Sequence, residues 1–565
     1  MGKTINNAYI KPLDKPVNTN VNVPGSKSYS QRALLIAAML GENVKIRNLL
    51  SSSDTKTMQE SISALKSGQS DIRIHESGLT ARFITALACI SNGAQTISGT
   101  LRLQKRPIKD LVEALQQLGA DIRYIDKDGY LPFKVMSSEL KGGEISLKGN
   151  ISSQYLSALL LIAPALKNGL TLNIEGHQIS KPYIDMTIDV MDHFGVKVEN
   201  HDYKQYVVKP QKYQAKDYFV EADYSSASYF YAINKLTWSN IKVQNLNPDS
   251  KQGDKKFVDL LKARELPTTI NAEDFPDQAM TVAILAAFNP NKTVINGVKS
   301  LRIKETERVE AIENELAKMG IKTKSTKDQL TIYGGNPRSA RIDTYNDHRL
   351  AMSFAVAGTK LPNMQIMNPK AVDKTFPGFW DELGKITDVK FEQKTFSNIL
   401  LTGMRGSGKS TIGRKLAKKL EMHFIDMDDY IENKNNQKVR DIVLTKGWKY
   451  FRDIESKACK ELSTKSNCVI SSGGGIVLRQ DNIDSFRSNS LIILLKSDPK
   501  KLSYRIKHDK NRPELSTQPT LIGELGEVWR KRKDSYFKNA DFIIETSYIS
   551  PKQAVNEIME KLKNL

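Results

Sequence analysis

One eight-residue segment strongly constrains the fold of the C-terminal part of this chain. The segment is Gly403-Met404-Arg405-Gly406-Ser407-Gly408-Lys409-Ser410; it follows the apolar run Ile399–Leu401 and precedes a helical pattern of Ile412, Leu416 and Leu420. A glycine-rich loop in this position lets backbone N–H groups surround a phosphate at the N-terminus of the next helix. In such loops the lysine reaches the β- and γ-phosphates of a nucleotide, and the serine hydroxyl can bind Mg²⁺. The segment therefore predicts a strand, a phosphate-binding loop and a helix in succession.

Apolar runs around this loop predict the sheet to which it belongs. They are Ile399–Leu401, Cys468–Ile470, Leu491–Leu495 and Phe542–Ile544, and helical segments separate them. Runs that are apolar throughout, rather than alternating, indicate a parallel sheet covered by helices on both faces. We therefore expect residues 398–565 to form an α/β/α domain.

Two acidic residues suggest what receives the phosphate. Phe424–Asp428 predicts the end of a strand, with Asp426 and Asp428 on one side because strand side chains alternate between two faces. One carboxylate can then serve a metal ion and the other a hydroxyl acceptor. Because phosphate-binding loops also occur in motor proteins and regulatory GTPases, other residues must identify the acceptor.

Further motifs give this region a family resemblance. They are Phe451-Arg452-Asp453-Ile454-Glu455, Ser472-Gly473-Gly474-Gly475, Asn511-Arg512-Pro513, and Arg532 with Tyr536 four residues later. In this order they resemble shikimate kinase over residues 398–565. The resemblance implies a P-loop α/β/α kinase with a five-stranded parallel sheet. Two departures are Glu514, where the family usually has Leu, and the missing proline between Arg532 and Tyr536.

The same resemblance implies roles for residues of this region. ATP is bound by Gly406, Ser407, Gly408, Lys409, Ser410, Thr411, Arg505 and Arg512, the last two on a mobile lid. Shikimate is bound by Asp428, Arg452, Gly473, Gly474, Gly475 and Arg532. Asp428 is the candidate base, Lys409 is catalytic, and Ser410 and Asp426 hold the Mg²⁺ that accompanies ATP. These roles agree with physical expectation, since a guanidinium makes bidentate contacts with a carboxylate and a lid excludes water.

The first 390 residues contain a repeated pattern. In three segments an amphipathic helix runs into a glycine and then into a strand: Leu111–Gly119, Thr187–Gly195 and Val309–Gly320. Gly320, in the last of these segments, is expected to end its helix as a C-cap. Helix and strand units that recur along the chain indicate a repeated α/β architecture rather than one doubly wound sheet.

Basic and polar clusters give residues 1–390 a resemblance to a second family. They are Val23–Ser28 with Arg32, Lys105-Arg106-Pro107, Ser152-Ser153-Gln154, Ser180–Tyr183, Lys304–Arg308, Asn346–Arg349 and Lys374–Pro377. In this order and spacing they resemble EPSP synthase, the 5-enolpyruvylshikimate-3-phosphate synthase family, over residues 1–390. The resemblance implies a two-lobed inside-out α/β barrel of six βαβαββ repeats, with one lobe from residues 1–23 and 221–390 and the other from 24–220. Residues 391–397 would then be a linker.

This second resemblance also implies a set of site residues. Shikimate 3-phosphate is bound by Lys27, Ser28, Arg32, Ser152, Ser153, Gln154, Ser180, Tyr183, Asp277, Ser300 and Lys304. Phosphoenolpyruvate is bound by Lys27, Gly78, Arg106, Gln154, Arg308, Arg349 and Lys374. Such cations neutralise charge whose burial would otherwise be penalised. Asp277 is the expected base toward the substrate hydroxyl, and Glu305 with Lys27 is the expected proton-transfer pair at phosphoenolpyruvate.

Two other interpretations compete with this one. UDP-N-acetylglucosamine enolpyruvyl transferase shares the fold and the chemistry but places a reactive cysteine before its Arg-Pro, and no cysteine lies near Arg106. In the other alternative the transferase carries a non-catalytic P-loop module that senses ATP. Asp428, Arg452 and Arg532 argue against a sensor, which needs no pocket for a polyol carboxylate. ATP consumption that depends on shikimate would separate the two.

Composition limits the remaining functions. The net charge is +21, but the lysines are scattered and no RNP-like segment occurs, so nucleic-acid binding is not expected. The apolar run Leu156–Leu166 is too short for a membrane span and contains Pro164, which predicts a buried core helix instead. Three cysteines without metal or redox spacing and an N-terminus without a targeting pattern favour the cytoplasm. The expected partners are therefore small-molecule substrates, and the sequence does not indicate an oligomeric state.

Overall fold

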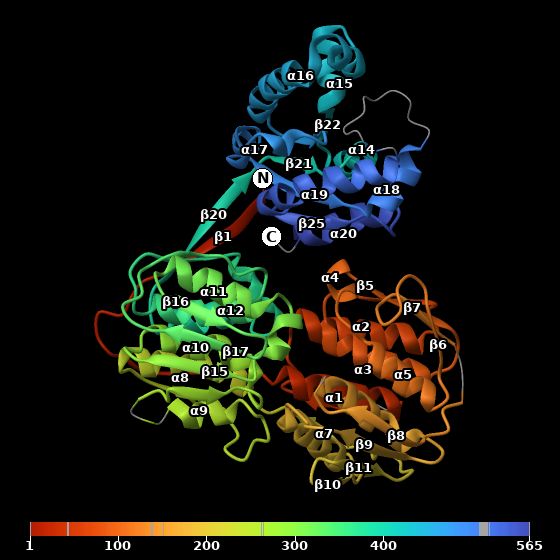
Figure 1. Cartoon of the computed structure of the whole chain (residues 1–565), viewed down its shortest axis with the longest axis vertical. Coiled ribbons are helices and arrows are strands. Elements are labelled where there is room, and N and C mark those ends of the chain that lie inside the picture. The colour runs from red at the N-terminus through yellow and green to blue at the C-terminus, as the bar shows by residue number, and fades with distance from the viewer. Residues whose placement is uncertain are drawn as a thin grey trace. The chain divides into compact units, whose positions relative to one another are not determined.

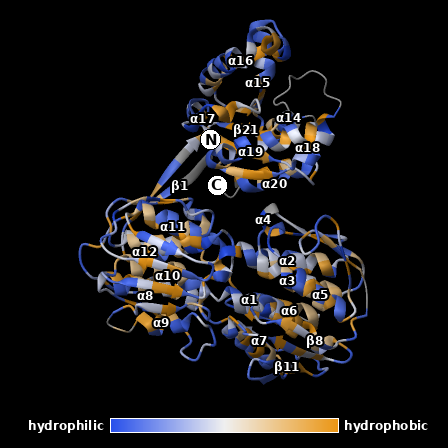
Figure 2. Cartoon of the chain, in the orientation of Figure 1, coloured by the Kyte–Doolittle hydropathy of each residue, from blue (hydrophilic) through white to orange (hydrophobic). Residues whose placement is uncertain are grey.

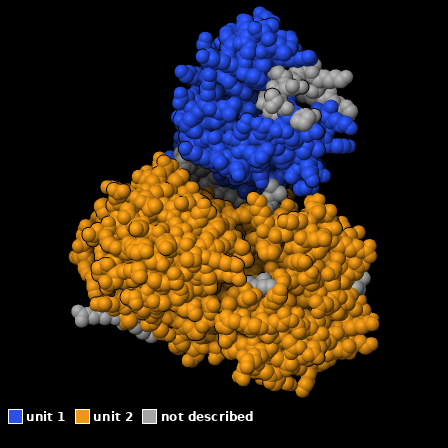
Figure 3. Space-filling model, viewed as in Figure 1, with its two compact units in different colours: residues 1–6, 393–565 blue, residues 7–392 orange. Residues whose placement is uncertain are grey.

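The computed structural model describes residues 2–41, 44–136, 139–150, 152–261, 263, 265–507, 518 and 520–563. The chain divides into two compact units, shown in different colours in Figure 3. Unit 1 consists of residues 1–6 and 393–565, and unit 2 of residues 7–392.

Three four-stranded sheets of unit 2 repeat one topology. Their strand orders are β4-β5-β7-β6, β8-β9-β11-β10 and β14-β15-β17-β16, and in each the first pair is parallel and the other two pairs are antiparallel. The strands are β4 (Asp71–Ile74), β5 (Gln95–Gly99), β6 (Asp121–Tyr124), β7 (Phe133–Met136), β8 (Gly143–Lys148), β9 (Leu170–Glu175), β10 (Glu199–His201), β11 (Gln205–Val208), β14 (Thr269–Asn271), β15 (Lys292–Asn296), β16 (Lys322–Ser325) and β17 (Gln329–Tyr333). Helices follow the first and second strand of each sheet, which gives the expected βαβαββ unit.

Three more sheets join distant parts of the chain. One has the order β18-β19-β1-β20, from β18 (Arg341–Ile342), β19 (Met364–Met367), β1 (Gly2–Ile10) and β20 (Val389–Phe396). The two small parallel pairs are β2 (Asn18–Val21) with β13 (Asn240–Val243) and β3 (Ile46–Arg47) with β12 (Tyr218–Phe219). Most of the stretch that the sequence suggests as a linker, residues 391–397, therefore lies within a strand.

The helix-glycine-strand pattern of the sequence appears in the structure. The helices are α5 (Lys109–Gln117), α7 (Lys181–His193) and α11 (Arg308–Lys318). The glycines that follow them, Gly119, Gly195 and Gly320, have φ values of 109°, 83° and 80°. Glycine adopts this left-handed region without strain, so each of these residues ends its helix, which was predicted for Gly320.

Unit 2 has two hydrophobic cores, one in each lobe. The first core draws its residues from Tyr29 to Val220, and the second from Ala8 to Val23 and from Ala222 to Ile386. Figure 1 shows the first lobe in red to gold and the second mainly in green. The chain passes between the lobes twice, and the two crossings lie side by side because Gly25 and Ala222 form an antiparallel bridge.

Helices of unit 2 cover the sheets with their apolar faces, and Figure 2 shows apolar and polar residues on the same helices. They are α1 (Lys27–Leu40), α2 (Ser53–Lys66), α3 (Gly78–Cys89), α4 (Leu101–Gln104), α6 (Ser153–Ile162), α8 (Tyr224–Thr237), α9 (Lys255–Leu261), α10 (Ala279–Ala287), α12 (His348–Gly358) and α13 (Phe379–Gly384), besides α5, α7 and α11. Short 3₁₀ turns include η1 (Ala163–Ala165), η2 (Pro276–Gln278), η3 (Lys299–Ile303) and η4 (Pro369–Lys374). The predicted buried core helix is α6 with η1.

Unit 1 contains the expected five-stranded parallel sheet. Its order is β22-β23-β21-β24-β25, from β21 (Asn398–Thr402), β22 (His423–Asp426), β23 (Cys468–Ser471), β24 (Ser490–Lys496) and β25 (Phe542–Glu545). Its helices are α14 (Lys409–Leu420), α15 (Met427–Asn435), α16 (Val439–Ser463), α17 (Gln480–Arg487), α18 (Pro499–Ile506), α19 (Leu521–Asn539) and α20 (Pro551–Lys563), with the turn η5 (Ile476–Leu478). Among the described residues of the chain, no helix is long and apolar enough to cross a membrane.

The prediction that Asp426 and Asp428 share one face of a strand is wrong. β22 ends at Asp426, whose side chain caps α15, and Asp428 lies in the first turn of that helix. Asp426 Oδ1 accepts a hydrogen bond from the Asp428 backbone N–H at 3.1 Å. The side-chain oxygen of Asp426 satisfies a helix-end N–H group that has no partner within the helix, and this favours a helix start over a longer strand.

Candidate active sites

A cavity of unit 2 lies between the two lobes. It is lined by Lys27, Ser28, Arg32, Gly78, Arg106, Ser152, Ser153, Gln154, Ser180, Tyr183, Asp277, Ser300, Lys304, Glu305, Arg308 and Arg349, all of which the sequence predicts as site residues. Lys374, which was also predicted, is not among the lining residues, but its Nζ lies 3.6 Å from Glu305 Oε1. Residues 152–183 come from the first lobe and residues 277–349 from the second, so folding brings them together.

Two carboxylates of the second lobe lie among cations at this cavity. Asp277 accepts a hydrogen bond from Arg308 Nη1 at 3.0 Å and forms an ion pair with Arg349 Nη2 at 2.9 Å. Glu305 lies 2.9 Å from Arg308 Nη2, and its other oxygen lies 3.9 Å from Arg106 of the first lobe. One guanidinium, that of Arg308, thus contacts both carboxylates.

The positive charges around these carboxylates decide their ionisation. Burial by itself would raise the pKa of Asp277, but Arg349, Lys304, Arg308 and Lys27 hold it well below its usual value. Burial is likewise outweighed at Glu305, whose pKa Arg308, Lys374 and Arg106 keep well below the ordinary range. Both groups are therefore charged at neutral pH.

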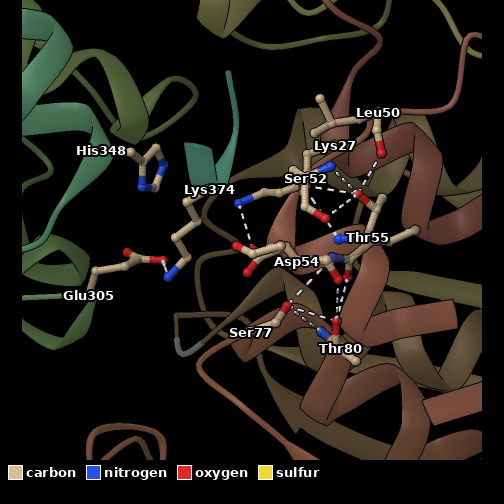
Figure 4. Close-up of polar contacts among 12 residues, drawn as sticks. Lys27, Leu50, Ser52, Asp54, Thr55, Ser77, Thr80, Glu305, His348 and Lys374 are labelled. Carbon is tan, nitrogen blue, oxygen red and sulfur yellow. Dashed lines mark hydrogen bonds and ion pairs between the residues drawn. The ribbon is translucent and has the colours of Figure 1, made fainter. Parts of the chain in front are cut away.

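Lys27 has an acidic partner that the sequence did not reveal. Its Nζ lies 3.3 Å from Asp54 Oδ2, and both belong to the first lobe. Figure 4 shows Asp54 held between Lys27 and the start of α3, with Lys374, Glu305 and His348 of the second lobe opposite. Thr80 Oγ1 donates to the Asp54 backbone carbonyl at 3.4 Å. Asp54 stands in an ordinary helix start, so only its contacts identify it.

The loop before α3 is fitted closely to Arg106. A Cβ on Gly78 would lie 2.3 Å from Arg106 Nη1, which explains glycine at this position. The buried Arg82 donates to the carbonyl of Gly78 at 2.9 Å and to that of Pro107 at 2.6 Å. Arg82 therefore ties the loop to the segment that carries Arg106, and it also lines the cavity.

Arg32, predicted to bind shikimate 3-phosphate, is 1% exposed and engaged inside the first lobe. Its guanidinium donates to Thr187 Oγ1 at 2.8 Å, to the carbonyl of Ser28 at 2.8 Å and to that of Tyr183 at 2.9 Å. Arg32 thus connects two predicted ligand residues, Ser28 and Tyr183, through their backbones.

The phosphate-binding loop of unit 1 has the expected local geometry. Gly406 and Gly408 adopt φ values of 79° and 94°, and α14 begins at Lys409. Lys409 Nζ donates to the carbonyls of Gly403 and Met404, both at 2.9 Å. Ser410 Oγ donates to Asp426 Oδ2 at 2.5 Å. The serine and aspartate predicted as metal ligands are therefore adjacent.

Two cavities of unit 1 meet at the carboxyl edge of the sheet. The first is lined by the loop residues Gly406–Thr411, by Arg505 and by Thr546. The second is lined by Arg452, Gly473, Gly474, Gly475 and Arg532 among others. Ser410, Asp426, Asp428 and Gly474 line both. A nucleotide in one cavity and an acceptor in the other would therefore touch at these four residues.

Arg452 lines the second cavity, and neighbouring side chains hold its guanidinium in place. Its Nη1 lies 2.7 Å from Glu455 Oε2, and its Cζ lies 5.0 Å from the ring centre of Trp448. A Cβ on Gly475 would come within 2.2 Å of the guanidinium. Burial raises the pKa of Glu455, while Arg452 opposes that rise. Trp448 and Glu455 are site residues that sequence reasoning missed, although Glu455 stands in the motif that names Arg452.

Arg532 reaches the same cavity from α19. Its Nη1 donates to the Gly474 carbonyl at 2.8 Å, and Tyr536 OH donates to the same oxygen at 2.5 Å. The spacing of four residues thus puts both side chains on one helix face. Arg512, the second predicted lid arginine, lies outside the described residues.

A solved structure resembles unit 2 in its fold. EPSP synthase from Acinetobacter baumannii matches with a TM-score of 0.57 at 21% identity, covering 68% of this chain and 100% of that one. This likeness and the parallel sheet with its phosphate-binding loop define the class of the chain, an EPSP synthase-like α/β protein joined to a P-loop domain.

Family models and curated relatives identify the family of each part of the chain. The model described as EPSP synthase (3-phosphoshikimate 1-carboxyvinyltransferase) matches residues 13–73, 65–273 and 262–383, and the shikimate kinase model matches residues 405–563. The 3-phosphoshikimate 1-carboxyvinyltransferase of Marinomonas sp. is 38% identical over 426 residues, which are 68% of this chain and 100% of that protein. The chain belongs to the EPSP synthase family, with a shikimate kinase domain fused behind it, as the motifs indicated.

Relatives that match both parts are larger proteins. The pentafunctional AROM polypeptide 2 of Lodderomyces elongisporus is 32% identical over 608 residues, which cover 93% of this chain and 39% of that polypeptide. The chain therefore spans about two fifths of the length of the AROM polypeptides it matches.

Proposed function

We propose that this chain is a bifunctional enzyme. Unit 1 phosphorylates shikimate with ATP, and unit 2 transfers the enolpyruvyl group of phosphoenolpyruvate to the shikimate 3-phosphate so formed, with release of phosphate. The proposal rests on the observation that one chain contains two sites suited to these two consecutive reactions. One is a nucleotide cavity that shares Ser410, Asp426, Asp428 and Gly474 with an arginine-lined acceptor cavity, and the other is a cage of cations around two carboxylates.

In the kinase site, Arg452 and Arg532 bind the carboxylate of shikimate, and the Gly473–Gly475 segment contacts the ring. Asp428 accepts the proton of the attacking hydroxyl, whose oxygen forms a bond to the γ-phosphorus as the bond to ADP breaks. Lys409 and the loop N–H groups stabilise the charge that develops on the phosphate oxygens. Arg505, which lines the nucleotide cavity, contacts the bound ATP.

The residues around Ser410 fit Mg²⁺. A hydroxyl and a carboxylate are the oxygen ligands that this ion prefers, and it takes few protein ligands when phosphates supply the rest. Ser410 Oγ and Asp426 Oδ2 already lie 2.5 Å apart. When bound, the ion would neutralise charge on the phosphates of ATP.

In the transferase site, shikimate 3-phosphate is held by Lys27, Ser28, Ser152, Ser153, Gln154, Ser180, Tyr183, Ser300 and Lys304, with Arg32 behind them. Phosphoenolpyruvate is held by Lys27, Gly78, Arg106, Gln154, Arg308, Arg349 and Lys374. Asp277 removes the proton of the substrate 5-hydroxyl, whose oxygen bonds to C2 of phosphoenolpyruvate. Lys27 and Glu305 act as the proton-transfer pair: the Lys27 ammonium delivers a proton to C3, and the ionised Glu305 accepts the C3 proton that is lost as the tetrahedral intermediate releases phosphate.

The low pKa of Asp277 is consistent with this role. In the free enzyme the surrounding cations make Asp277 a weak base. Two bound anions would reduce that positive field, and the pKa of Asp277 would rise toward a value useful for proton removal. The substrates would thus activate their own base.

A transferase with an ATP-sensing module is the alternative. It does not account for Arg452 and Arg532, which point two guanidinium groups at a cavity that shares residues with the nucleotide site. A sensor has no use for an anion-binding acceptor cavity.

The deciding experiment supplies the purified protein with shikimate, MgATP and phosphoenolpyruvate and follows ADP and enolpyruvyl product together. We expect Lys409→Ala to lose ADP formation and to regain enolpyruvyl transfer when shikimate 3-phosphate is added. Asp277→Asn should lose enolpyruvyl transfer alone. Matched controls are Lys415→Ala on α14 and Glu310→Gln on α11, two exposed residues that should leave both rates unchanged. No ADP from shikimate with wild-type protein would refute the kinase assignment.

A further inference from the structure

A buried acidic residue lies behind Asp277, and the proposed reaction does not use it. Asp254 is 4% exposed and precedes α9 in the second lobe of unit 2. Its Oδ1 accepts a hydrogen bond from Gln278 Nε2 at 3.0 Å, and its Oδ2 accepts one from Ser225 Oγ at 2.8 Å. Both donors are uncharged. Burying a carboxylate without a direct cationic partner is costly, so this residue requires an explanation.

Gln278, the first of these donors, is the immediate neighbour of Asp277. Both residues belong to the single turn η2. Gln278 is fully buried, and its Oε1 accepts a hydrogen bond from Ser228 Oγ of α8. Because both ends of the Gln278 amide are held, the turn that carries Asp277 is fixed against α8. Asp254 supplies one of these two restraints.

The chain before Asp254 is packed where the two lobes meet. A Cβ on Gly253 would lie 2.1 Å from the Asp274 carbonyl oxygen and 2.9 Å from the ring of Pro182, which belongs to the first lobe. Gln252 Nε2 donates to the Ala222 carbonyl at 2.8 Å, at one of the two crossings between lobes. The segment that carries Asp254 is therefore packed where the two lobes meet and is not an exposed loop.

Charged groups face Asp254 from several elements. They are Arg349 of α12, Asp277 of η2 and Asp223 at the start of α8. Tyr183 of α7 feels the charges of both Asp277 and Asp254. Burial raises the pKa of Asp254 to about 6, while Arg349 opposes the rise. The residue thus changes its charge within a range of pH at which the protein can be assayed.

We propose that Asp254 is a positioning residue for enolpyruvyl transfer, holding the turn that carries Asp277 through its hydrogen bond from Gln278. The inference rests on the proposed transferase activity. It adds to that activity a residue that is not part of the lining of the cavity between the lobes and that acts from behind the base.

The test compares kcat and KM for enolpyruvyl transfer from phosphoenolpyruvate to shikimate 3-phosphate in four single variants. Asp254→Ala and Gln278→Ala break the same link from its two ends, and each should lower kcat by about tenfold to a hundredfold, as small displacements of a base do. KM for either substrate should change much less than kcat, because the substrate ligands are untouched. Asp254→Asn, which keeps the shape, should retain more activity than Asp254→Ala. Ser225→Ala removes the other hydrogen bond of Asp254 and should keep kcat near the wild-type value.

A double variant and a pH profile separate positioning from mere stability. Because both substitutions break one link, Asp254→Ala/Gln278→Ala should be no slower than the slower single variant. In wild-type protein, protonation of Asp254 should contribute a fall in kcat below about pH 6, and Asp254→Asn should lack that contribution. A purely structural role would lower the melting temperature without changing the profile.

The outcomes distinguish this inference from the proposal beneath it. If wild-type protein transfers no enolpyruvyl group, the proposed function fails and the inference falls with it. If wild type is active and Asp254→Ala and Gln278→Ala keep the wild-type kcat, the inference alone is overturned. The inference would also be overturned if the fold-losses in kcat of the two single variants multiplied in the double variant. Should Asp254→Ala not fold, Gln278→Ala and the profile of Asp254→Asn decide the question.

Discussion

Arg308 and Asp347 form a buried ion pair with two hydrogen bonds in the second lobe of unit 2. Arg308 Nε donates to Asp347 Oδ2 at 2.8 Å and Nη2 to Oδ1 at 3.3 Å. The side chains are 1% and 0% exposed. Arg308 also contacts Asp277 and Glu305, so Asp347, which has no role in the proposed reaction, fixes the guanidinium that touches both candidate proton carriers.

Removing Asp347 should destabilise unit 2 strongly. Asp347→Ala leaves Arg308 buried without its closest partner, and we expect the free energy of unfolding to fall by about 3–5 kcal/mol. Urea unfolding measures this, with the kinase activity of unit 1 as an internal reference. Asp388→Ala, which removes an exposed carboxylate 4.0 Å from Lys11, is the control and should cost less than about 1 kcal/mol. Equal losses in the two variants would contradict the account.

The stability of unit 2 should depend on His348 in acid. Burial, helped by Arg349 and Lys27, holds the pKa of His348 well below its usual value, so the folded form keeps a neutral ring. The unfolded chain binds a proton near its ordinary pKa of about 6.5. The contribution of His348 is therefore complete above about pH 6.5 and is lost as pH falls toward the folded pKa, by up to about 1.4 kcal/mol per pH unit.

The measurement compares wild type with His348→Phe at pH 7.5 and pH 5.5 in urea. The wild-type protein should lose more free energy of unfolding between these values than the variant does, because phenylalanine has no proton to bind. Other groups titrate in both proteins alike and cancel in the comparison. Identical pH slopes would show that His348 is not neutral in the folded state.

Asp426 should govern the metal requirement of the kinase reaction. Asp426→Ala removes the carboxylate that lies 2.5 Å from Ser410 Oγ, and we expect the Mg²⁺ concentration for half-maximal ADP formation to rise about tenfold or more. The KM for shikimate should change little, since Arg452 and Arg532 are untouched. Asp429→Ala removes a neighbouring exposed carboxylate and serves as the control. An unchanged Mg²⁺ dependence would exclude Asp426 from the metal site.

Glycine at position 475 should be required for shikimate binding. A Cβ there would lie 2.2 Å from three guanidinium atoms of Arg452, so Gly475→Ala must displace the arginine. We expect KM for shikimate to rise at least about tenfold, the loss of one charge-assisted contact, while KM for ATP stays near wild type. The matched control is Gly526→Ala in α19, where nothing lies within 4 Å of the new Cβ. That variant should gain about 0.5–1 kcal/mol of stability. An unchanged KM for shikimate in Gly475→Ala would show that Arg452 does not bind it.

Local patterns in the sequence determined much of the architecture. The run Gly403–Ser410 was enough to predict a strand, a loop and a helix, because glycine geometry and a helix N-terminus create a phosphate site within a few residues. Gly119, Gly195 and Gly320 marked helix ends for the same reason, since a left-handed backbone is a property of one residue. The cationic motifs that line the cavity of unit 2 were also recognisable from their order along the chain.

Asp428 marks the limit of such local reasoning. A separation of two residues between Asp426 and Asp428 is compatible with a strand and with the start of a helix. The side chain of Asp426 caps α15, so Asp428 lies in the first turn of that helix. The sequence also left Trp448 without a role, although the kink at Gly447, with φ 78°, interrupts α16 immediately before it.

Tertiary structure alone decided which charges are paired and which carboxylates are buried. Asp54 meets Lys27 across two helices, Arg106 meets Glu305 across two lobes, and Asp254 meets Gln278 behind the base. The residues in these pairs lie between 24 positions apart, for Asp254 and Gln278, and 199 positions apart, for Arg106 and Glu305. A sequence specifies such pairs only through the whole fold, because hydrogen bonds and ion pairs depend on distances of a few ångströms that no local pattern sets.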